Sequence, residues 1–367
     1  MASGRVHLVT LVSSPPDILM SHLLSRQVRC FLCAILTTSL LALGGCTRGH
    51  AVVARSPGAE LAGAVVWFGP SFAADVDALA RWRRSVGPPV IAVQGGGEPV
   101  ADRLVVVNWN VHVGAGDVTR LFADVRARAG HGLPIVLLLQ EVYRSGAEVP
   151  RQVEAGAAFA SLIRGARRDG ARDPIGALAA RLGLHAYYVP SMRNGGAGSD
   201  EDRGNAILST VPLADLHAIE LPFERQRRVA VAATVGGRTQ AGAPWRVRVV
   251  SAHLDTFGGA RRLWLAGGEL SRARQARGLV AALEGHTPMV LGADLNTWFG
   301  FHDSAYREAI RAFPQTLVTD RRATFGGLLR LDHLFFRLDD GWTASFQRAE
   351  RSYGSDHYPL IGQVEFR

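Results

Sequence analysis

The chain has 367 residues, 47% of them hydrophobic, which is enough for one large domain or two small ones and ordinary for a globular protein. Nothing repeats at a solenoid period, so a repeat architecture is excluded. The formal net charge of +9 suggests a polyanionic partner, but all 41 basic residues are arginine. A GC-rich genome explains that bias equally well, so the charge favours nucleic acid or anionic lipid only slightly.

Residues 1–46 are predicted to be a lipoprotein-type signal peptide. Arg26 and Arg29 precede an apolar stretch, residues 31–43, which has the length of a signal peptide rather than of a membrane span. The stretch ends in Leu43-Gly44-Gly45-Cys46, which resembles a bacterial lipobox. We therefore expect a lipid on Cys46. The alternatives are an ordinary secretory signal with a chance cysteine, or a short anchor that is never cut.

Cysteine usage agrees with an exported protein. Cys30 and Cys33 lie in the predicted signal, so the mature domain has no pair for a disulfide and no thiolate metal site. Any metal must be held by oxygen and imidazole ligands. Thr47 follows the lipobox where an aspartate would retain a lipoprotein, an arrangement that resembles outer-membrane sorting. Met20 would give a signal of more usual length, so either methionine is a candidate start.

Residues 47–102 are predicted to be a tether followed by a small βαβ-like segment. Residues 47–58 are predicted to form a polar tether. The pattern of residues 62–93 predicts a strand, a helix and a second strand. Glycines at 95–97 then separate this piece from the main domain, residues 103–367.

The main domain alternates between apolar runs and amphipathic ones. Its many strands and few long helices predict two stacked sheets flanked by helices. Strands are expected near 104–109, 135–140, 185–190, 204–209, 228–236, 245–252, 288–293, 331–337, 342–348 and 359–366. Helices are expected near 117–129, 171–182, 261–284 and 303–312. Segments 144–170 and 191–203 are predicted to be irregular.

Six apolar runs end in polar side chains that can do chemistry. A residue just past a buried strand can present its side chain to a cleft, and six such endings indicate one active site. The endings are Asn108-Trp109-Asn110, Gln140-Glu141, Ser251-Ala252-His253, Asp294-Leu295-Asn296, Asp332-His333 and Asp356-His357.

In this order the six endings resemble the motifs of the endonuclease/exonuclease/phosphatase superfamily. That group includes deoxyribonuclease I, exonuclease III-like enzymes, neutral sphingomyelinases and inositol polyphosphate 5-phosphatases. The segments Gly292–Asn296 and Ser355–Pro359 are the more specific matches, and the resemblance runs from about residue 104 to 367. It implies an α/β fold of the deoxyribonuclease I type, a four-layer sandwich of two packed mixed β-sheets flanked by helices.

The resemblance implies a divalent metal site with Glu141 as the first ligand. Glu141 ends a run of aliphatic residues, and hydrophobic burial does not explain a carboxylate at that position. Asn110 is expected to hold the metal or its water shell and to orient Glu141, and Asp356 is the third contributor. Mg²⁺ or Mn²⁺ suits such oxygen ligands. No cluster of three histidines or cysteines is apparent, so zinc is not expected.

Five residues are expected to be catalytic. Asp294 would orient or deprotonate the attacking water, and Asn296, two residues on, would donate to a phosphate oxygen. His253 and His357 are the imidazoles expected at the phosphate, and nearby carboxylates should raise their pKa values. Asp332 resembles the family aspartate that pairs with the final histidine, which would make Asp332 and His357 a hydrogen-bonded dyad.

Substrate contacts are expected from the neighbouring strands. Asn205, in a segment that resembles a strand lining the family's cleft, is a candidate, although a turn residue is an equal alternative. Asp255 and Arg203 are further candidates. Further arginines, Arg225, Arg227 and Arg228, could also contact a phosphate.

The chain departs from the exonuclease III-like pattern at one position. Those nucleases often carry an acidic residue two positions beyond the first asparagine, and here that residue is His112.

The implied function is a divalent-metal-dependent phosphoesterase that cuts a phosphodiester at the cell envelope, on nucleic acid or a phospholipid headgroup. The alternatives are an inositol-phosphate-type phosphomonoesterase and a catalytically inactive binding lipoprotein on the same fold. An inactive descendant would usually lose Glu141, Asp294 or His357, and all three are present. The motifs do not select among substrates, because enzymes of several specificities share them. A monomer held to the membrane by its lipid is expected.

Overall fold

The computed structural model describes residues 49–55, 64–130, 132–152, 172–195, 198–256, 264–285 and 288–366. Gly49–Arg367 form one compact unit. The predicted signal peptide and Cys46 lie outside the described residues.

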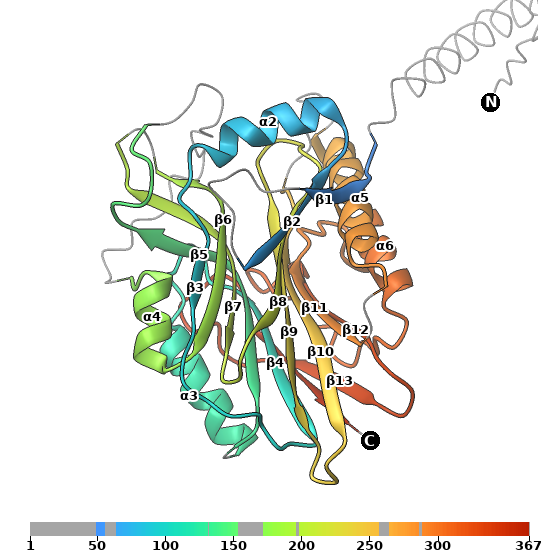
Figure 1. Cartoon of the computed structure of the whole chain (residues 1–367). Helices are drawn as coiled ribbons and strands as arrows, with labels where there is room; N and C mark the ends of the chain where they lie inside the picture. Colours follow the sequence, from blue (N-terminus) through green and yellow to red (C-terminus); the bar gives the residue numbers. More distant parts are fainter. Residues whose placement is uncertain are drawn as a thin grey trace, which may run out of the picture. The chain divides into compact units, whose positions relative to one another are not determined.

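The first sheet has seven strands in the order β1-β2-β8-β9-β10-β11-β12 (Figure 1). These are β1 (Val52–Arg55), β2 (Val65–Pro70), β8 (Ala214–Glu220), β9 (Val229–Arg238), β10 (Pro244–His253), β11 (Met289–Asp294) and β12 (Asp332–Arg337). The pairs β2–β8 and β10–β11 are parallel, and the other neighbours are antiparallel. The sheet is therefore mixed.

The second sheet also has seven strands, in the order β13-β14-β4-β5-β7-β6-β3. These are β13 (Thr343–Arg348), β14 (Leu360–Glu365), β4 (Arg103–Asn110), β5 (Ile135–Ser145), β7 (Glu201–Ser209), β6 (His185–Asn194) and β3 (Val90–Ala92). Only β4 and β5 run parallel.

The two sheets pack face to face, with helices on both outer faces. Along β4, Leu104 and Val106 enter the core between the sheets, and Val105 and Val107 face outward, because successive side chains of a strand alternate. The helices are α2 (Ala73–Arg83), α3 (Val118–Ala129), α4 (Ile175–Leu182), α5 (Trp264–Ala282), the short 3-10 helix η2 (Gly300–His302) and α6 (Ser304–Ala312).

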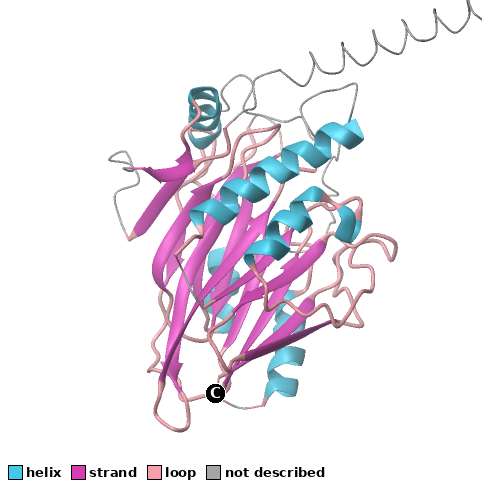
Figure 2. Cartoon of the chain, turned by 90° about the vertical axis from the view of Figure 1, so that its right-hand side faces the viewer, coloured by secondary structure: helices cyan, strands magenta, loops and turns pink. Residues whose placement is uncertain are grey.

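Each outer face has its own pair of helices. Helices α3 and α4 cover the second sheet, and α5 and α6 cover the first (Figures 1 and 2). The predicted four-layer sandwich of two mixed sheets is confirmed.

Local sequence signals set the helix ends. The carboxylate of Asp117 accepts a hydrogen bond from the Arg120 amide at 2.9 Å and begins α3, and Asp303 caps α6 in the same way through Ala305 at 3.1 Å. Helix α4 ends at Gly183, whose φ of 64° lies in the left-handed region that glycine adopts without steric cost. These caps agree with the helices predicted from periodicity.

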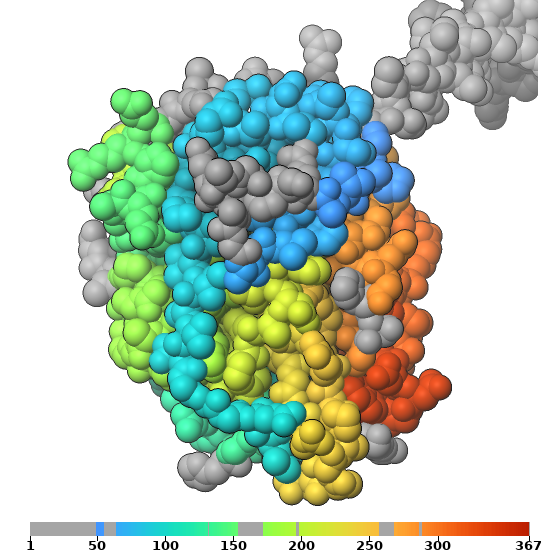
Figure 3. Space-filling model, viewed as in Figure 1, coloured from blue at the N-terminus to red at the C-terminus, as the bar shows by residue number. Residues whose placement is uncertain are grey.

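The segment before residue 103 contributes two strands, β1 and β2, to the first sheet and one strand, β3, to the second. Strand β2 pairs with β8 of the first sheet, and β3 pairs with β6 of the second. Helix α2, between them, contacts β2 and β6. Figure 3 shows this part of the chain, in blue and cyan, lying on the surface beside the strands of both sheets.

Three local predictions differ from the structure. Residues 52–55, predicted to belong to the polar tether, form β1, which pairs with β2. Strand β8 was not expected, because Asp215 and His217 interrupt its apolar pattern, but β2 and β9 pair with it on both sides. Segment 191–203, predicted to be irregular, instead supplies the ends of the antiparallel strands β6 and β7, which reach Asn194 and start at Glu201. Strand pairing supplies hydrogen bonds that a local sequence pattern does not reveal.

None of the helices in the described residues is both long and apolar enough to cross a membrane.

Candidate active site

The residues that follow the strands meet at one end of the sandwich. In the first sheet, His253, Asp294 and Asp332 occupy neighbouring positions in register across β10, β11 and β12. In the second sheet, Asn110 at the end of β4 is in register with Gln140 of β5. The structure thereby brings together a set that we call the carboxylate–imidazole cluster: Asn110, Glu141, His253, Asp294, Asp332, Asp356 and His357.

Asp294 lies at the centre of this cluster. One carboxylate oxygen, Oδ2, accepts a hydrogen bond from the Asn110 amide at 2.9 Å and lies 3.4 Å from Nε2 of His253 and 3.9 Å from Nε2 of His357. The other oxygen, Oδ1, accepts from the backbone of Asn296 at 3.0 Å. The Asn110 side chain therefore joins the two sheets at the site through Asp294, a contact that the sequence did not predict.

Asp332 and His357 form a hydrogen-bonded pair. Nδ1 of His357 lies 2.7 Å from Oδ2 of Asp332, and the His357 backbone amide donates to the Ser355 hydroxyl at 3.1 Å. The same hydroxyl donates to the backbone carbonyl of Asn110 at 2.7 Å. Ser355, which the sequence analysis did not single out, thus anchors the histidine to the end of β4.

Electrostatics in the cluster favour a charged His357. Burial opposes its charge, but the Asp332 carboxylate outweighs burial and raises the pKa of His357 to about 10. Burial and the nearby Asp332 also raise the pKa of Asp294 to about 7. At neutral pH the cluster therefore holds an imidazolium beside a carboxyl group that is ready to exchange a proton.

His253 behaves differently from the expectation. The sequence predicted that nearby carboxylates raise the pKa values of both imidazoles, and this is wrong for His253. Burial and then the positive charge of Arg228 lower its pKa well below the usual value. His253 is neutral at physiological pH and can donate only one ring N–H.

A bulge in β5 turns Glu141 toward the site. The register of β5 against β7 shifts between Leu139 and Val142, and Glu141 has a φ of 53°, in the left-handed region. Its side chain is 23% exposed, and its nearest cationic partner is Arg203 at 3.5 Å. Strain of this kind at a polar strand end is typical of functional sites.

Beneath Glu141, a buried polar network connects the two sheets. The amide of Gln140 donates to Oδ1 of Asn108 and to the hydroxyl of Ser251, each at 2.9 Å. The Asn108 amide donates to the backbone carbonyl of His333 at 3.2 Å. The sequence analysis gave these residues no role, yet the network holds the strand ends in register. Asn108 and Ser251 each lie between hydrophobic residues in the sequence, and this pattern was the signal that could have identified them.

His112, the departure from the exonuclease III-like pattern, pairs with Asp356. Nδ1 of His112 lies 2.8 Å from Oδ1 of Asp356. The Asp356 carboxylate at this distance raises the pKa of His112, and the same contact lowers the pKa of Asp356 although burial opposes it. An imidazole–carboxylate pair therefore stands at the position where an acidic residue was expected from the exonuclease III-like pattern.

A small pocket adjoins the cluster and shares two of its residues. We call it the arginine pocket. It has a volume of about 10 Å³ and is lined by Glu141, Ser191, Met192, Arg203, Gly204, Asn205, Arg228 and His253. The two arginines thus lie beside the carboxylate–imidazole cluster.

The other predicted substrate contacts already have partners. The Asn205 amide donates to the carbonyl of Val229 at 2.6 Å. The buried Asp255 carboxylate accepts from the backbone amides of Arg225 and Gln226 at 2.9 and 3.1 Å. The guanidinium of Arg227, 1% exposed, pairs with Glu220 at 2.8 Å and faces away from the pocket's lining. These contacts hold the pocket wall in place.

Asn296 has part of its hydrogen-bonding capacity in use. Its φ is 51°, and its amide donates to the carbonyl of Leu254 at 3.0 Å. An asparagine amide has two N–H donors, so a second one remains for another acceptor.

Exposure separates the carboxylates that could hold a hydrated cation from those that could not. Atoms of Asp294, Asp332 and His357 lie within 4.8 Å of one another, which satisfies a distance criterion for a metal. However, the carboxylates of that trio are at most 1% exposed, whereas those of Glu141 and Asp356 are 23% and 40% exposed. Mg²⁺ keeps several water ligands. The predicted oxygen donors therefore fit such an ion better than the buried trio does.

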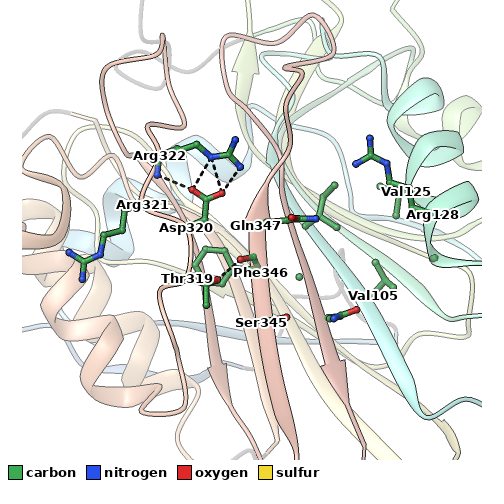
Figure 4. Close-up of a pocket in the computed structure, with 14 residues that line it drawn as sticks. Val105, Val125, Arg128, Thr319, Asp320, Arg321, Arg322, Ser345, Phe346 and Gln347 are labelled. Atoms are coloured by element: carbon green, nitrogen blue, oxygen red, sulfur yellow. Dashed lines mark hydrogen bonds and ion pairs between the residues drawn. The ribbon is translucent and has the colours of Figure 1, made fainter.

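A cavity with a volume of about 850 Å³ lies elsewhere in the described part of the chain. It lies between α3 and the 319–322 segment, over the outer face of β13 and β14 (Figure 4). The guanidinium of Arg322 there is bound by Asp320 and Glu350. No residue of the carboxylate–imidazole cluster lines this cavity, so convergence of ionisable groups, rather than volume, identifies the candidate site.

Comparison with known families identifies the class of protein. The model of the endonuclease/exonuclease/phosphatase family matches residues 107–357, more than half of the chain, and the chain therefore belongs to this family. Family members are generally phosphoester hydrolases and typically use divalent metals. A search of curated proteins found no match.

Solved structures of low sequence identity also match. One is an endonuclease/exonuclease/phosphatase from Beutenbergia cavernae, with 19% identity, a TM-score of 0.48 and 72% of each chain covered. Sphingomyelinase C from Streptomyces griseocarneus has 20% identity and a TM-score of 0.41, with 72% of this chain and 99% of that one covered. A family protein from Leptotrichia buccalis has 14% identity and a TM-score of 0.45, with 73% and 100% covered.

Proposed function

We propose that this chain is a divalent-metal-dependent phosphoesterase that hydrolyses a phosphodiester in nucleic acid or in a phospholipid headgroup. One observation supports this most: the buried Asp294, with a pKa near 7, lies between two imidazoles, one charged and one neutral. Phosphate-ester hydrolysis needs a proton acceptor for water and donors for the phosphoryl oxygens, and this trio supplies both.

The buried side chains divide the chemistry between them. Asp294 takes the proton from the attacking water, because a pKa near the working pH suits a general base. His357, held in one orientation by Asp332, donates from Nε2 to a phosphoryl oxygen. His253 donates from its single N–H, and the second amide N–H of Asn296 serves the same oxygens.

The exposed carboxylates would hold the metal. Glu141 and Asp356 are the proposed ligands, with Asn110 at the metal or its water shell, and Mg²⁺ or Mn²⁺ is the proposed ion. When bound, such an ion neutralises the negative charge of the phosphoryl group.

A turnover screen tests this function. The purified protein would be incubated with Mg²⁺ or Mn²⁺ and DNA, RNA, sphingomyelin, phosphatidylinositol phosphates or bis-p-nitrophenyl phosphate. The monoester p-nitrophenyl phosphate separates diester from monoester cleavage. We expect turnover of at least one diester, lost in Asp294→Asn. If the parent and this variant release product equally slowly from every substrate, the proposal fails.

We further propose that the enzyme is a monomer anchored at the bacterial cell envelope by lipid on Cys46. The lipobox-like sequence supports this. Mass spectrometry should find lipid on Cys46, and Cys46→Ser should release the protein from membranes. An unmodified Cys46, or a Cys46→Ser variant still processed and membrane-bound, contradicts the anchor.

A further inference from the structure

One buried arginine at the site has no hydrogen-bond partner in the described part of the chain. Arg228 is 6% exposed, and its guanidinium makes no hydrogen bond to the described residues. Every other buried arginine in that part of the chain makes at least one. Its nearest carboxylate, on Asp255, is 3.7 Å away, beyond normal hydrogen-bond distance, and is already bound by two backbone amides. A buried cation left unsatisfied is costly, so such groups are retained where a ligand completes them.

The space in front of Arg228 suits a single oxygen atom. The arginine pocket has a volume of about 10 Å³, about enough for one water-sized atom. Arg203, 20% exposed on its side chain, lines the same pocket. Within the described residues it has two weak side-chain contacts, with Glu141 at 3.5 Å and with the Met192 sulfur at 3.6 Å. Both arginines also depress the pKa of His253, which places their charge next to the proposed catalytic groups.

Helix α2 is connected to Arg227, the residue before Arg228, by a chain of ion pairs through the buried Glu220. Arg83, near the end of α2, donates to both oxygens of the fully buried Glu220, one of them at 3.1 Å. Glu220 also accepts from Arg227 at 2.8 Å, and Arg227 donates to the carbonyl of Pro190 at 2.7 Å. Arg228, the next residue, lines the arginine pocket and Arg227 does not, so the two adjacent side chains leave the backbone on different sides. Fixing Arg227 on one face therefore fixes Arg228 on the other.

Trp82, the residue before Arg83 in α2, is connected to Arg203 through Met192. Trp82 is buried with Met192, and Phe223 packs against both, with its ring centroid 6.1 Å from that of Trp82. The sulfur of Met192 in turn contacts Arg203. Two consecutive residues of one helix thus support the two arginines of the pocket. This helix lies outside residues 107–357, the part that matches the family model.

We propose that Arg228, with Arg203 beside it, binds a phosphate oxygen of the substrate, and that α2 positions Arg228 for this through Arg83, Glu220 and Arg227. This proposal rests on the proposed function for its substrate class. It makes the segment before residue 103 a part of the active site. Guanidinium groups suit this task because they stay charged when buried and match phosphate geometry.

Binding of inorganic phosphate tests the first part without any turnover. Isothermal titration of the full chain in detergent should show phosphate binding, weakened about 10- to 100-fold in Arg228→Met, as expected when a charge-assisted hydrogen bond is lost. The melting temperature of Arg228→Met should not fall, because the change removes an unsatisfied buried charge.

A second buried arginine provides the control. Arg248, 4% exposed, is bonded to the carbonyl of Asp215 and to Thr234, and does not line the arginine pocket. Arg248→Met should lower the melting temperature and leave phosphate affinity unchanged. Equal phosphate affinity in the parent and Arg228→Met, or no phosphate binding by the parent, overturns the proposal.

Substitutions in α2 test the positioning part. Arg83→Met should weaken phosphate binding several-fold, Arg83→Lys should restore part of it, and the exposed Arg81→Met should change nothing. Adding Arg83→Met to Arg228→Met should cause no further loss of affinity, because both act on one contact. If Arg83→Met lowers the melting temperature but leaves phosphate affinity intact, α2 has a purely structural role and this part is wrong.

The two proposals fail in distinguishable ways. Phosphate binding that depends on Arg228, without turnover of any ester, supports the arginine site and contradicts the proposed hydrolysis. Turnover whose KM and kcat are both unchanged in Arg228→Met supports the proposed hydrolysis and contradicts the arginine site.

Discussion

The two sides of the candidate site meet their hydrogen-bonding needs in different ways. On one side, Asp294 accepts hydrogen bonds from the Asn110 side chain and the Asn296 backbone, and Asp332 is bonded to His357, at distances between 2.7 and 3.0 Å. On the arginine side, the contacts of Arg203 with Glu141 and Met192 are 3.5 and 3.6 Å long. The guanidinium of Arg228 makes no contact within hydrogen-bond distance in the described residues.

Under the two proposals, this difference separates catalytic groups, which bond to one another, from the arginines, which bind substrate. A mutually bonded set keeps fixed proton positions and pKa values, as a catalytic set requires. Buried donors without acceptors are unfavourable until an anion arrives, as a binding set requires. Substitutions on the first side should therefore reduce turnover, and substitutions on the second should reduce affinity.

Removing the metal should have the largest effect. With excess EDTA, turnover should fall to background, because oxygen ligands alone cannot neutralise the phosphoryl group. Glu141→Gln should lower both the affinity for Mg²⁺, measured by titrating activity with the ion, and the maximal rate. Full activity in excess chelator would exclude the proposed metal site.

Asp294→Asn should reduce kcat by about 10²- to 10⁴-fold, because it removes the proton acceptor but keeps the shape of the site. KM should stay nearly unchanged, since binding is assigned to the arginine side. Steady-state kinetics on the best diester substrate measure both. A variant that loses affinity but keeps kcat would place Asp294 with the binding groups instead.

His357→Ala should reduce kcat by about 10²-fold or more, and Asp332→Asn by less, because Asp332 acts through the imidazole. In the double variant the losses should be markedly non-additive, since the pair acts as one unit. Effects that simply multiply would give Asp332 an independent role.

The pH dependence should report the same pair. Activity in the parent should rise as Asp294 loses its proton near pH 7, and should fall as His357 loses its proton near pH 10. The Asp332 charge raises both pKa values, so Asp332→Asn should move both limbs of the pH–rate profile to lower pH. Limbs that stay in place would show that Asp332 does not set these pKa values.

Arg203→Met should have the smallest effect. Its contacts are long and it is partly exposed, so KM should rise about 10-fold or less while kcat stays nearly constant. The comparison with Asp294→Asn, measured on the same substrate, is the sharpest one. If Arg203→Met lowers kcat and leaves KM unchanged, Arg203 belongs with the catalytic groups and the distinction between the two sides is wrong.

The amino-acid sequence by itself was enough for the fold class and for the residues that the structure brings together in the carboxylate–imidazole cluster. Strand periodicity predicted most of the strands, and polar residues such as Glu141, Asp294 and His357 stood out because each ends an apolar run. These signals are local: a buried strand and its polar end are adjacent in the chain, so a linear reading can find them.

Only the tertiary structure decided which of these groups bond and what their pKa values are. The pairing of His112 with Asp356, and the low pKa of His253, depend on neighbours far away in the chain. The same is true of α2, whose Arg83 meets Glu220 at a separation of 137 residues. Sequence patterns report burial, whereas charge interactions depend on distance in space, and long-range packing sets that distance.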